Sequence, residues 1–137
     1  MRIAVLKESA AGETRVAATP ETVKKIIALG HSVGVQAGAG EAAAAPDQLY
    51  SEAGAEISAD GGVGQADLVV KVRRPSEAEI SAIRPSAGLV SLLEPYGDRA
   101  TIEALAKAQI SALAMEFIPR ISRAQSMDAL SSQANLA

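Results

Sequence analysis

Short apolar runs alternate with amphipathic segments along most of this chain. The runs consist mainly of Val, Ile, Leu and Ala, and polar residues, Gly or Pro bound them. Continuous apolar runs of about four to eight residues are typical of strands that are buried on both faces of a parallel sheet. The expected strands lie around residues 3–6, 32–37, 55–57, 67–72, 88–93 and 110–115.

The segments between these runs carry the signals that start and end helices. Thr19 precedes Pro20, and Gly30 follows the last apolar residue, which gives one helix an N-cap, a first-turn proline and a C-terminal glycine. Ser76 and Glu79 have the spacing of a capping box at the start of another helix. The expected helices lie around residues 20–29, 46–53, 76–85 and 98–109. This alternation predicts right-handed crossovers and a doubly wound α/β fold, a Rossmann- or flavodoxin-like lobe with a mostly parallel sheet and helices on both faces.

Composition narrows the classes of function. The chain has 137 residues, enough for one domain, and a formal net charge of −3 without a basic cluster. It therefore lacks the electrostatic signature of a protein that binds nucleic acid or anionic lipid. It has no cysteine and a single histidine, so we expect no disulfide and no metal site. No apolar run approaches the ~20 residues that span a bilayer, and we expect no direct membrane insertion by this chain.

A glycine-rich stretch follows the second expected strand but does not complete a nucleotide-binding motif. In the G-x-G-x-x-G pattern, Gly38 and Gly40 would be followed by a third glycine at the position of Ala43. No long helix is expected to begin there either. We therefore interpret the stretch as a turn, and the lobe as one without its own glycine fingerprint.

The segment 120–137 has the periodicity of a helix but an unusual polar face. At about 100° per residue, Met127 and Leu130 share one side with the alanines that follow them. Gln125 and Asp128 lie on the opposite side. That side offers amides, hydroxyls and a carboxylate rather than Lys and Glu, which suits recognition of sugar hydroxyls and carboxamides. A serine three residues before Gln125 also completes a capping-box pattern, so backbone capping is the alternative role for these side chains.

Three segments of the chain resemble one protein family. The run PRISRAQSMDALSSQANLA at 119–137 is similar to the signature of the alpha subunit of proton-translocating nicotinamide nucleotide transhydrogenases. GETRVA at 12–17 and VKVRRP at 70–75 resemble the N-terminal domain that these subunits share with alanine dehydrogenases. The resemblance implies that residues 1–119 form the N-terminal α/β lobe. Residues 120–137 would then form the signature loop and the start of a helix leading to an NAD-binding Rossmann domain outside this sequence.

The resemblance implies that the terminal segment contacts the nicotinamide end of NAD(H). In the family, the residue matching Arg120 contacts the carboxamide, and the one matching Gln125 reaches the nicotinamide ribose beside the NADP(H) of a partner subunit. Residues matching Asp128 and Ser131 complete the polar wall, and hydride transfer then depends on positioning rather than on acid–base chemistry. Gln125 and Asp128 are therefore the candidate catalytic positions. The implied cofactor-binding set is Arg120, Ile121, Ser122, Arg123, Gln125, Asp128 and Ser131.

A second set of matched positions concerns substrate binding in the alanine dehydrogenase branch. There, the residues matching Arg15 and Lys71 hold the carboxylate and carbonyl of a keto acid, and a histidine on a later strand supports the chemistry. The best alignment places Leu92 at the histidine position, and leucine cannot donate a proton or a hydrogen bond. We therefore interpret Arg15 and Lys71 as the remnant of a substrate pocket. The alternative is that they form structural ion pairs with carboxylates such as Glu8 or Glu13.

The resemblance favours one function and leaves two alternatives. It implies part of the NAD(H)-binding subunit of a proton-translocating transhydrogenase, which transfers hydride between NADH and NADP⁺ and couples this to proton movement across a membrane. The implied partners are a second alpha subunit in a homodimer, the NADP-binding beta subunit and the membrane domain, with this lobe peripheral on the cytoplasmic side. The implied cofactors are NAD(H) in the complete subunit and NADP(H) on the partner. The alternatives are an alanine dehydrogenase-like lobe and a truncated, non-catalytic folding or dimerisation module.

Overall fold

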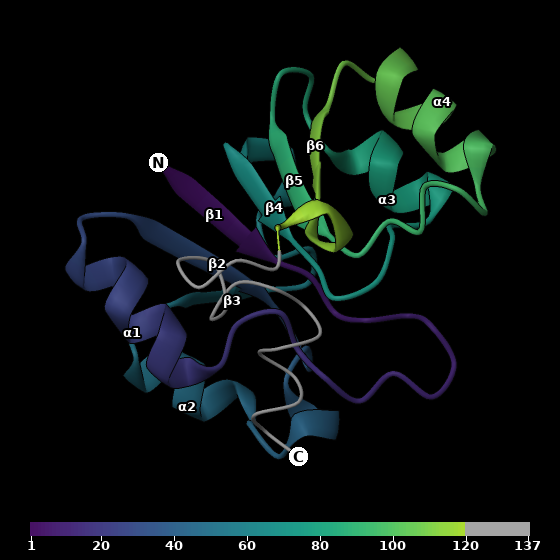
Figure 1. Ribbon diagram of the computed structural model, residues 1–137. Coiled ribbons are helices and arrows are strands. Elements are labelled where there is room, and N and C mark those ends of the chain that lie inside the picture. The colour runs from purple at the N-terminus through teal and green to yellow at the C-terminus, as the bar shows by residue number, and fades with distance from the viewer. Residues whose placement is uncertain (120–137) are drawn as a thin grey trace.

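The computed structural model of this chain describes residues 1–119, and its strands form one parallel sheet (Figure 1). The described strands follow the order β3-β2-β1-β4-β5-β6, and every neighbouring pair is parallel. The predicted parallel sheet is thereby confirmed. The strands are β1 (Arg2–Val5), β2 (Ser32–Gln36), β3 (Glu56–Ser58), β4 (Leu68–Val70), β5 (Gly88–Ser91) and β6 (Ser111–Ala114).

Helices cover both faces of this sheet, as predicted. Val23 and Tyr50, from the first two helices, pack with Val5 of β1 in one core. Ile80 and Leu105, from the last two helices, pack in a second core with the residues on either side of Val5, Ala4 of β1 and Leu6 just after it. Successive strand residues point to opposite faces, so β1 contributes to both cores and the fold is doubly wound. The helices are α1 (Pro20–Ala28), α2 (Asp47–Glu52), α3 (Glu77–Ala82) and α4 (Arg99–Lys107).

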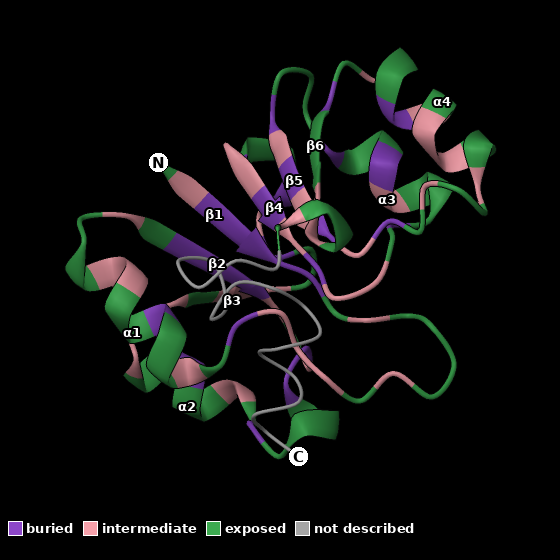
Figure 2. Ribbon diagram, viewed as in Figure 1, coloured by how far each residue is buried: buried purple, intermediate pink, exposed green. Residues whose placement is uncertain are grey.

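Burial follows this layering (Figure 2). The central strands are largely buried, whereas the outer sides of α1 and α4 are exposed. Each fully buried Val, Leu or Ile contributes roughly 1.5–3 kcal/mol relative to an exposed side chain. Within residues 1–119, no helix is long and apolar enough to cross a bilayer.

The helix caps lie where the sequence predicts them. The Thr19 side chain accepts a hydrogen bond from the backbone N–H of Thr22 (3.3 Å) at the start of α1. At the start of α3, the Ser76 hydroxyl accepts from the Glu79 N–H (3.2 Å), and the Glu79 carboxylate accepts from the Ser76 N–H (2.7 Å). Asp98 caps α4 with its carboxylate. These bonds satisfy N–H groups that have no partner within their own helix.

The connection from β3 to β4 differs from the other crossovers because it contains no α-helix. Residues 59–67 include only the short 3₁₀ turn η2 (Val63–Gln65). This connection passes very close to β2, since a Cβ on Gly34 would lie 2.3 Å from the carbonyl oxygen of Gly61. A glycine at position 34 therefore lets the connection pack directly on the strand.

The glycine-rich stretch after β2 is a turn, as predicted. Gly38 has a φ of +74°, a conformation that favours glycine, and its N–H donates to the Asp47 carboxylate (2.9 and 3.1 Å). The 3₁₀ turn η1 (Glu41–Ala43) follows it. So short a turn does not provide the helix N-terminus at which dinucleotide phosphates bind.

β4 and β5 end earlier than the apolar pattern predicts, but the chain stays beside the sheet. The Lys71 N–H donates to the carbonyl oxygen of Val90 (3.0 Å), and the Leu92 N–H donates to that of Val72 (3.0 Å). The residues that follow these strands are therefore held at the carboxyl edge of the sheet.

Candidate functional site

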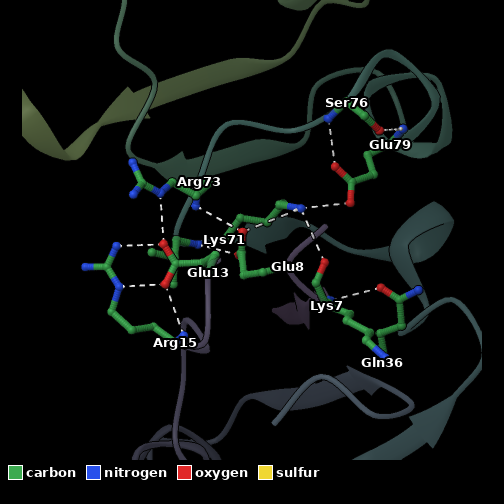
Figure 3. Close-up of polar contacts among 10 residues, drawn as sticks. Lys7, Glu8, Glu13, Arg15, Gln36, Lys71, Arg73, Ser76 and Glu79 are labelled. Carbon is green, nitrogen blue, oxygen red and sulfur yellow. Dashed lines mark hydrogen bonds and ion pairs between the residues drawn. The ribbon is translucent and has the colours of Figure 1, made fainter. Parts of the chain in front are cut away.

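The carboxyl ends of β1 and β4 meet at the point where the strand order reverses. Open α/β sheets bind ligands at such a switch point, in the crevice outside the carboxyl ends of the strands. β1 leads into Lys7 and Glu8, and β4 leads into Lys71 and Arg73. Figure 3 shows Arg15 and Arg73 meeting at Glu13, and the Lys71 side chain reaching Glu79. We define the switch-point cluster as Glu8, Glu13, Arg15, Lys71, Arg73 and Glu79.

Lys71 lies at the centre of this cluster, and its side chain is completely buried. Its Nζ donates to the Glu79 carboxylate (2.7 Å) and to the backbone oxygen of Lys7 (3.4 Å), and it lies 3.9 Å from the Glu8 carboxylate. A buried ammonium group is costly unless it is paired and hydrogen-bonded. Glu79 therefore neutralises Lys71 with one oxygen while its other oxygen caps α3 (Figure 3).

Glu8 joins the segment after β1 to the segment after β4. Its side chain is almost fully buried, and its carboxylate accepts from the backbone N–H groups of Val72 (2.7 Å) and Arg73 (3.1 Å). Backbone donors that leave a strand need such partners when water is excluded. The hydrogen-bonding capacity of Glu8 is thus directed to the backbone and to Lys71.

Glu13 pairs with two arginines. Nε and one terminal nitrogen of Arg15 each lie 2.8 Å from a Glu13 oxygen, and Nε of Arg73 also lies 2.8 Å from the carboxylate. The hydrogen bond from Arg15 is the largest cause that lowers the pKa of Glu13 from 4.5 to about 2; Arg73 also lowers it, while burial opposes the shift. Bidentate, charge-assisted pairs of this kind are among the stronger hydrogen bonds in proteins. The same pairing raises the pKa of Arg15.

A small cavity of about 130 Å³ lies beside the cluster. The side chains of Lys7, Glu8, Glu13 and Arg15 line it, together with the turn after β2. Lys71 does not line it, because the buried ammonium group is engaged by Glu79 at the start of α3. Arg15 and Lys71, which the resemblance predicts to be the remnant of a substrate pocket, therefore do not face one cavity.

Leu92 lies directly after β5 and is half-buried. It does not line the 130 Å³ cavity, and its side chain carries no group that could donate a proton. The preceding Ser91 is fully buried, and its hydroxyl has no hydrogen-bond partner among the described residues. Residues 1–119 also contain no group of acidic or histidine side chains arranged to hold a metal ion.

The sequence identified part of this cluster but missed two members. Arg15 pairs with Glu13, as the structural alternative expects, whereas Lys71 pairs most closely with Glu79. Glu79 was visible in the sequence only as a capping residue. Its second role, like that of Arg73, depends on how α3 and the segment after β4 approach one another in space.

The residues that the resemblance assigns to NAD(H) lie beyond Pro119, outside the described residues. This holds for the candidate catalytic positions as well as for the other cofactor contacts. They are Arg120, Ile121, Ser122, Arg123, Gln125, Asp128 and Ser131.

Comparison with models of known families matches residues 4–137 to the family described as alanine dehydrogenase/PNT, N-terminal domain. The chain belongs to this family. Its two branches are both represented among similar proteins, and the chain spans less than half the length of the relatives described next.

The transhydrogenase relatives are the more similar ones. An NAD(P) transhydrogenase alpha-subunit polypeptide of Rhodospirillum rubrum is 48% identical over 144 residues, which cover 100% of this chain and 38% of that protein. A crystal structure of transhydrogenase from Sinorhizobium meliloti matches with a TM-score of 0.95 and 48% identity, over 99% of this chain and 41% of that one. An L-alanine dehydrogenase structure matches with a TM-score of 0.82 and 31% identity, over 90% and 34% respectively.

Proposed function

We propose that this chain is the N-terminal portion of the NAD(H)-binding alpha subunit of a proton-translocating transhydrogenase. The complete enzyme would move a hydride from C4 of NADH to C4 of NADP⁺, giving NAD⁺ and NADPH, and would couple this to proton movement across a membrane. The identity of 48% to transhydrogenases, against 31% to an alanine dehydrogenase, supports this choice within the family.

One observation of the structure supports the transhydrogenase assignment most strongly. The cations of the switch-point cluster are already paired with carboxylates of the same chain. A keto-acid carboxylate would have to displace Glu13 from Arg15, where the existing pair has two contacts of 2.8 Å. Its carbonyl would have to reach Lys71, which is completely buried and held by Glu79 at 2.7 Å. Leu92 then adds no acid or base. This arrangement disfavours keto-acid chemistry and favours a structural role for the cluster.

In this proposal the chemistry depends on residues 120–131. Arg120 would hold the carboxamide of the nicotinamide ring, and Gln125 its ribose, with Asp128 and Ser131 completing a polar wall. None of these groups exchanges a proton with the substrate; they hold the ring at the distance and angle that hydride transfer requires. NAD(H) binding would be completed by the Rossmann domain of the subunit, and NADP(H) would lie on the partner.

The proposed assembly follows from the same assignment. Two alpha subunits would form a homodimer that binds the NADP-binding beta subunit and the membrane domain, on the cytoplasmic side and without inserting into the bilayer.

The family alternative is an alanine dehydrogenase-like enzyme, which is favoured by the position of Arg15 in a cavity at the switch point. The remaining alternative is a folding or dimerisation module without catalysis.

Gln125→Asn in the complete subunit, assembled with its NADP-binding partner, tests the proposal. The shorter amide should misplace the nicotinamide ribose, and a displacement of about 1 Å can slow a reaction on the order of 100-fold. Stopped-flow hydride transfer between bound nucleotides should therefore fall by that order, with a much smaller change in NADH affinity by calorimetry. Gln133→Asn is the matched control and should leave both unchanged. An unaltered transfer rate for Gln125→Asn would leave Gln125 as a capping residue.

A further inference from the structure

Two loops at the carboxyl edge of the sheet are joined by two independent contacts. One loop follows β5, and the other is the 3₁₀ turn η3 (Met115–Phe117) after β6. The Glu94 N–H donates to the Glu116 carboxylate (2.7 Å). The rings of Tyr96 and Phe117 meet edge to face, with 5.9 Å between their centroids. We call these four residues the clasp.

The clasp has features that stability does not explain. Tyr96 is 93% exposed and Phe117 58% exposed, although the chain contains only three aromatic residues. Glu94 has a φ of +49°, a left-handed conformation that is unfavourable for a residue with a side chain. Such conformations persist where surrounding contacts hold them, and they gather at functional sites. Exposed contacts contribute little to stability, so these residues call for another role.

The clasp is also connected to the switch-point cluster. The Glu94 carboxylate lies 3.3 Å from Arg73 and 3.7 Å from Arg74. Arg73 in turn lies 2.8 Å from Glu13. Contacts therefore run continuously from Glu13 of the switch-point cluster to η3, the last described element before Pro119.

We infer that the clasp is a positioning device for the segment that begins at Arg120. Only Ile118 and Pro119 separate η3 from Arg120. Proline fixes its own φ and restricts the residue before it, so this short connection has little freedom to absorb a shift of η3. An η3 held by the clasp thus fixes the position and direction of the chain at Pro119, the residue before Arg120. The inference rests on the proposed function, in which those residues hold the nicotinamide ring.

The test uses Glu116→Ala and Tyr96→Ala in the complete subunit assembled with its NADP-binding partner. Each should lower the rate of hydride transfer on the order of 10-fold, because misplacement of the ring costs rate, while NADH affinity changes less than about threefold. Glu116→Gln keeps an acceptor oxygen and Tyr96→Phe keeps the ring, so both should restore most of the rate. Glu103→Ala, which removes an exposed carboxylate from an ion pair on α4, is the control and should change neither quantity.

A second readout separates failure of this inference from failure of the proposed function. Hydrogen exchange of residues 120–131, followed by mass spectrometry without nucleotide, should accelerate in both alanine variants and not in Glu103→Ala. Unchanged exchange would overturn the positioning role, whatever the enzyme does. A different outcome is that exchange accelerates in the variants but the unsubstituted subunit transfers no hydride. That result would support the positioning role of the clasp and refute the transhydrogenase assignment.

Discussion

The switch-point cluster and the clasp lie on the same edge of the sheet but are built in opposite ways. In the cluster, Glu8 and Glu13 retain 3% and 5% of their side-chain exposure, and Lys71 none. In the clasp, Glu94 is 57% exposed and holds a left-handed backbone conformation. Buried charges must be matched by the protein itself, whereas exposed charges are matched largely by water. Position at a ligand-binding edge therefore does not by itself identify the functional group.

This difference assigns distinct roles to the two groups. The cluster ties the segments after β1 and β4 to α3, and the charges that do so are already paired. The clasp contributes little burial and is adjacent in sequence to the segment for which we propose contacts with NAD(H). Substitutions in the cluster should therefore affect folding, and those in the clasp should affect positioning.

The largest effect on stability is expected for Lys71→Met. Removing the buried ammonium leaves Glu79 without its closest cation, and breaking a buried pair in this way costs about 3–5 kcal/mol. Urea unfolding would measure the loss. Lys25→Met, which removes a 73% exposed lysine from an ion pair with Glu21, should change the free energy of unfolding by no more than about 0.5 kcal/mol. If both variants lost a similar, small free energy of unfolding, Lys71 would contribute no more to stability than an exposed lysine. The proposed difference between the cluster and the clasp would then be wrong.

A smaller, pH-dependent effect is expected for Glu13→Gln. Because the folded-state pKa of Glu13 is lowered to about 2, its ionised form stabilises the fold above the ordinary pKa of 4.5. The variant should therefore lose about 1–3 kcal/mol at neutral pH, a range that allows for the partial exposure of both arginines. That difference from the unsubstituted chain should shrink as the pH falls from 4.5 towards 2. Thermal unfolding across this range would show it, and a difference independent of pH would contradict the assignment.

The smallest effect on stability is expected for Glu94→Gly. The substitution removes the contacts with Arg73 and Arg74, but glycine adopts a φ of +49° without strain. The two effects oppose each other, so the free energy of unfolding should change by about 0.5 kcal/mol or less. Calorimetric melting would measure it. A loss comparable to that of Lys71→Met would mean that the clasp is as structural as the cluster.

Local sequence signals predicted the helices and strands well, because the interactions that start and end these elements involve residues close together in the sequence. The caps at Thr19, Ser76 and Asp98 use side chains within three residues of the N–H groups they satisfy. The apolar runs likewise predicted the parallel strands, and the runs of the central strands β1 and β2 are largely buried, whereas the edge strand β6 is mostly exposed. No helix was predicted in the β3–β4 connection, and none is present; there Gly61 packs closely on Gly34.

The candidate site was less predictable because its contacts join distant segments of the chain. Glu8 reaches the segment after β4 across more than sixty residues of sequence, and no spacing rule links them. Glu79 shows a capping-box pattern, which says nothing about its contact with Lys71. No sequence pattern predicted the clasp. Its exposed aromatic pair and its glutamate with a positive φ become apparent only in the folded chain.

The most direct test of the central claim is NADH oxidation by the complete subunit with pyruvate and ammonia, measured beside hydride transfer to NADP⁺ in the presence of the partner subunit. A general acid–base group usually contributes about 10²–10⁴-fold, and Leu92 supplies none. With Arg15 held by Glu13 and Lys71 by Glu79, we predict hydride transfer to NADP⁺ and no pyruvate-dependent oxidation. Pyruvate- and ammonia-dependent oxidation of NADH would contradict the claim and establish the alanine dehydrogenase alternative.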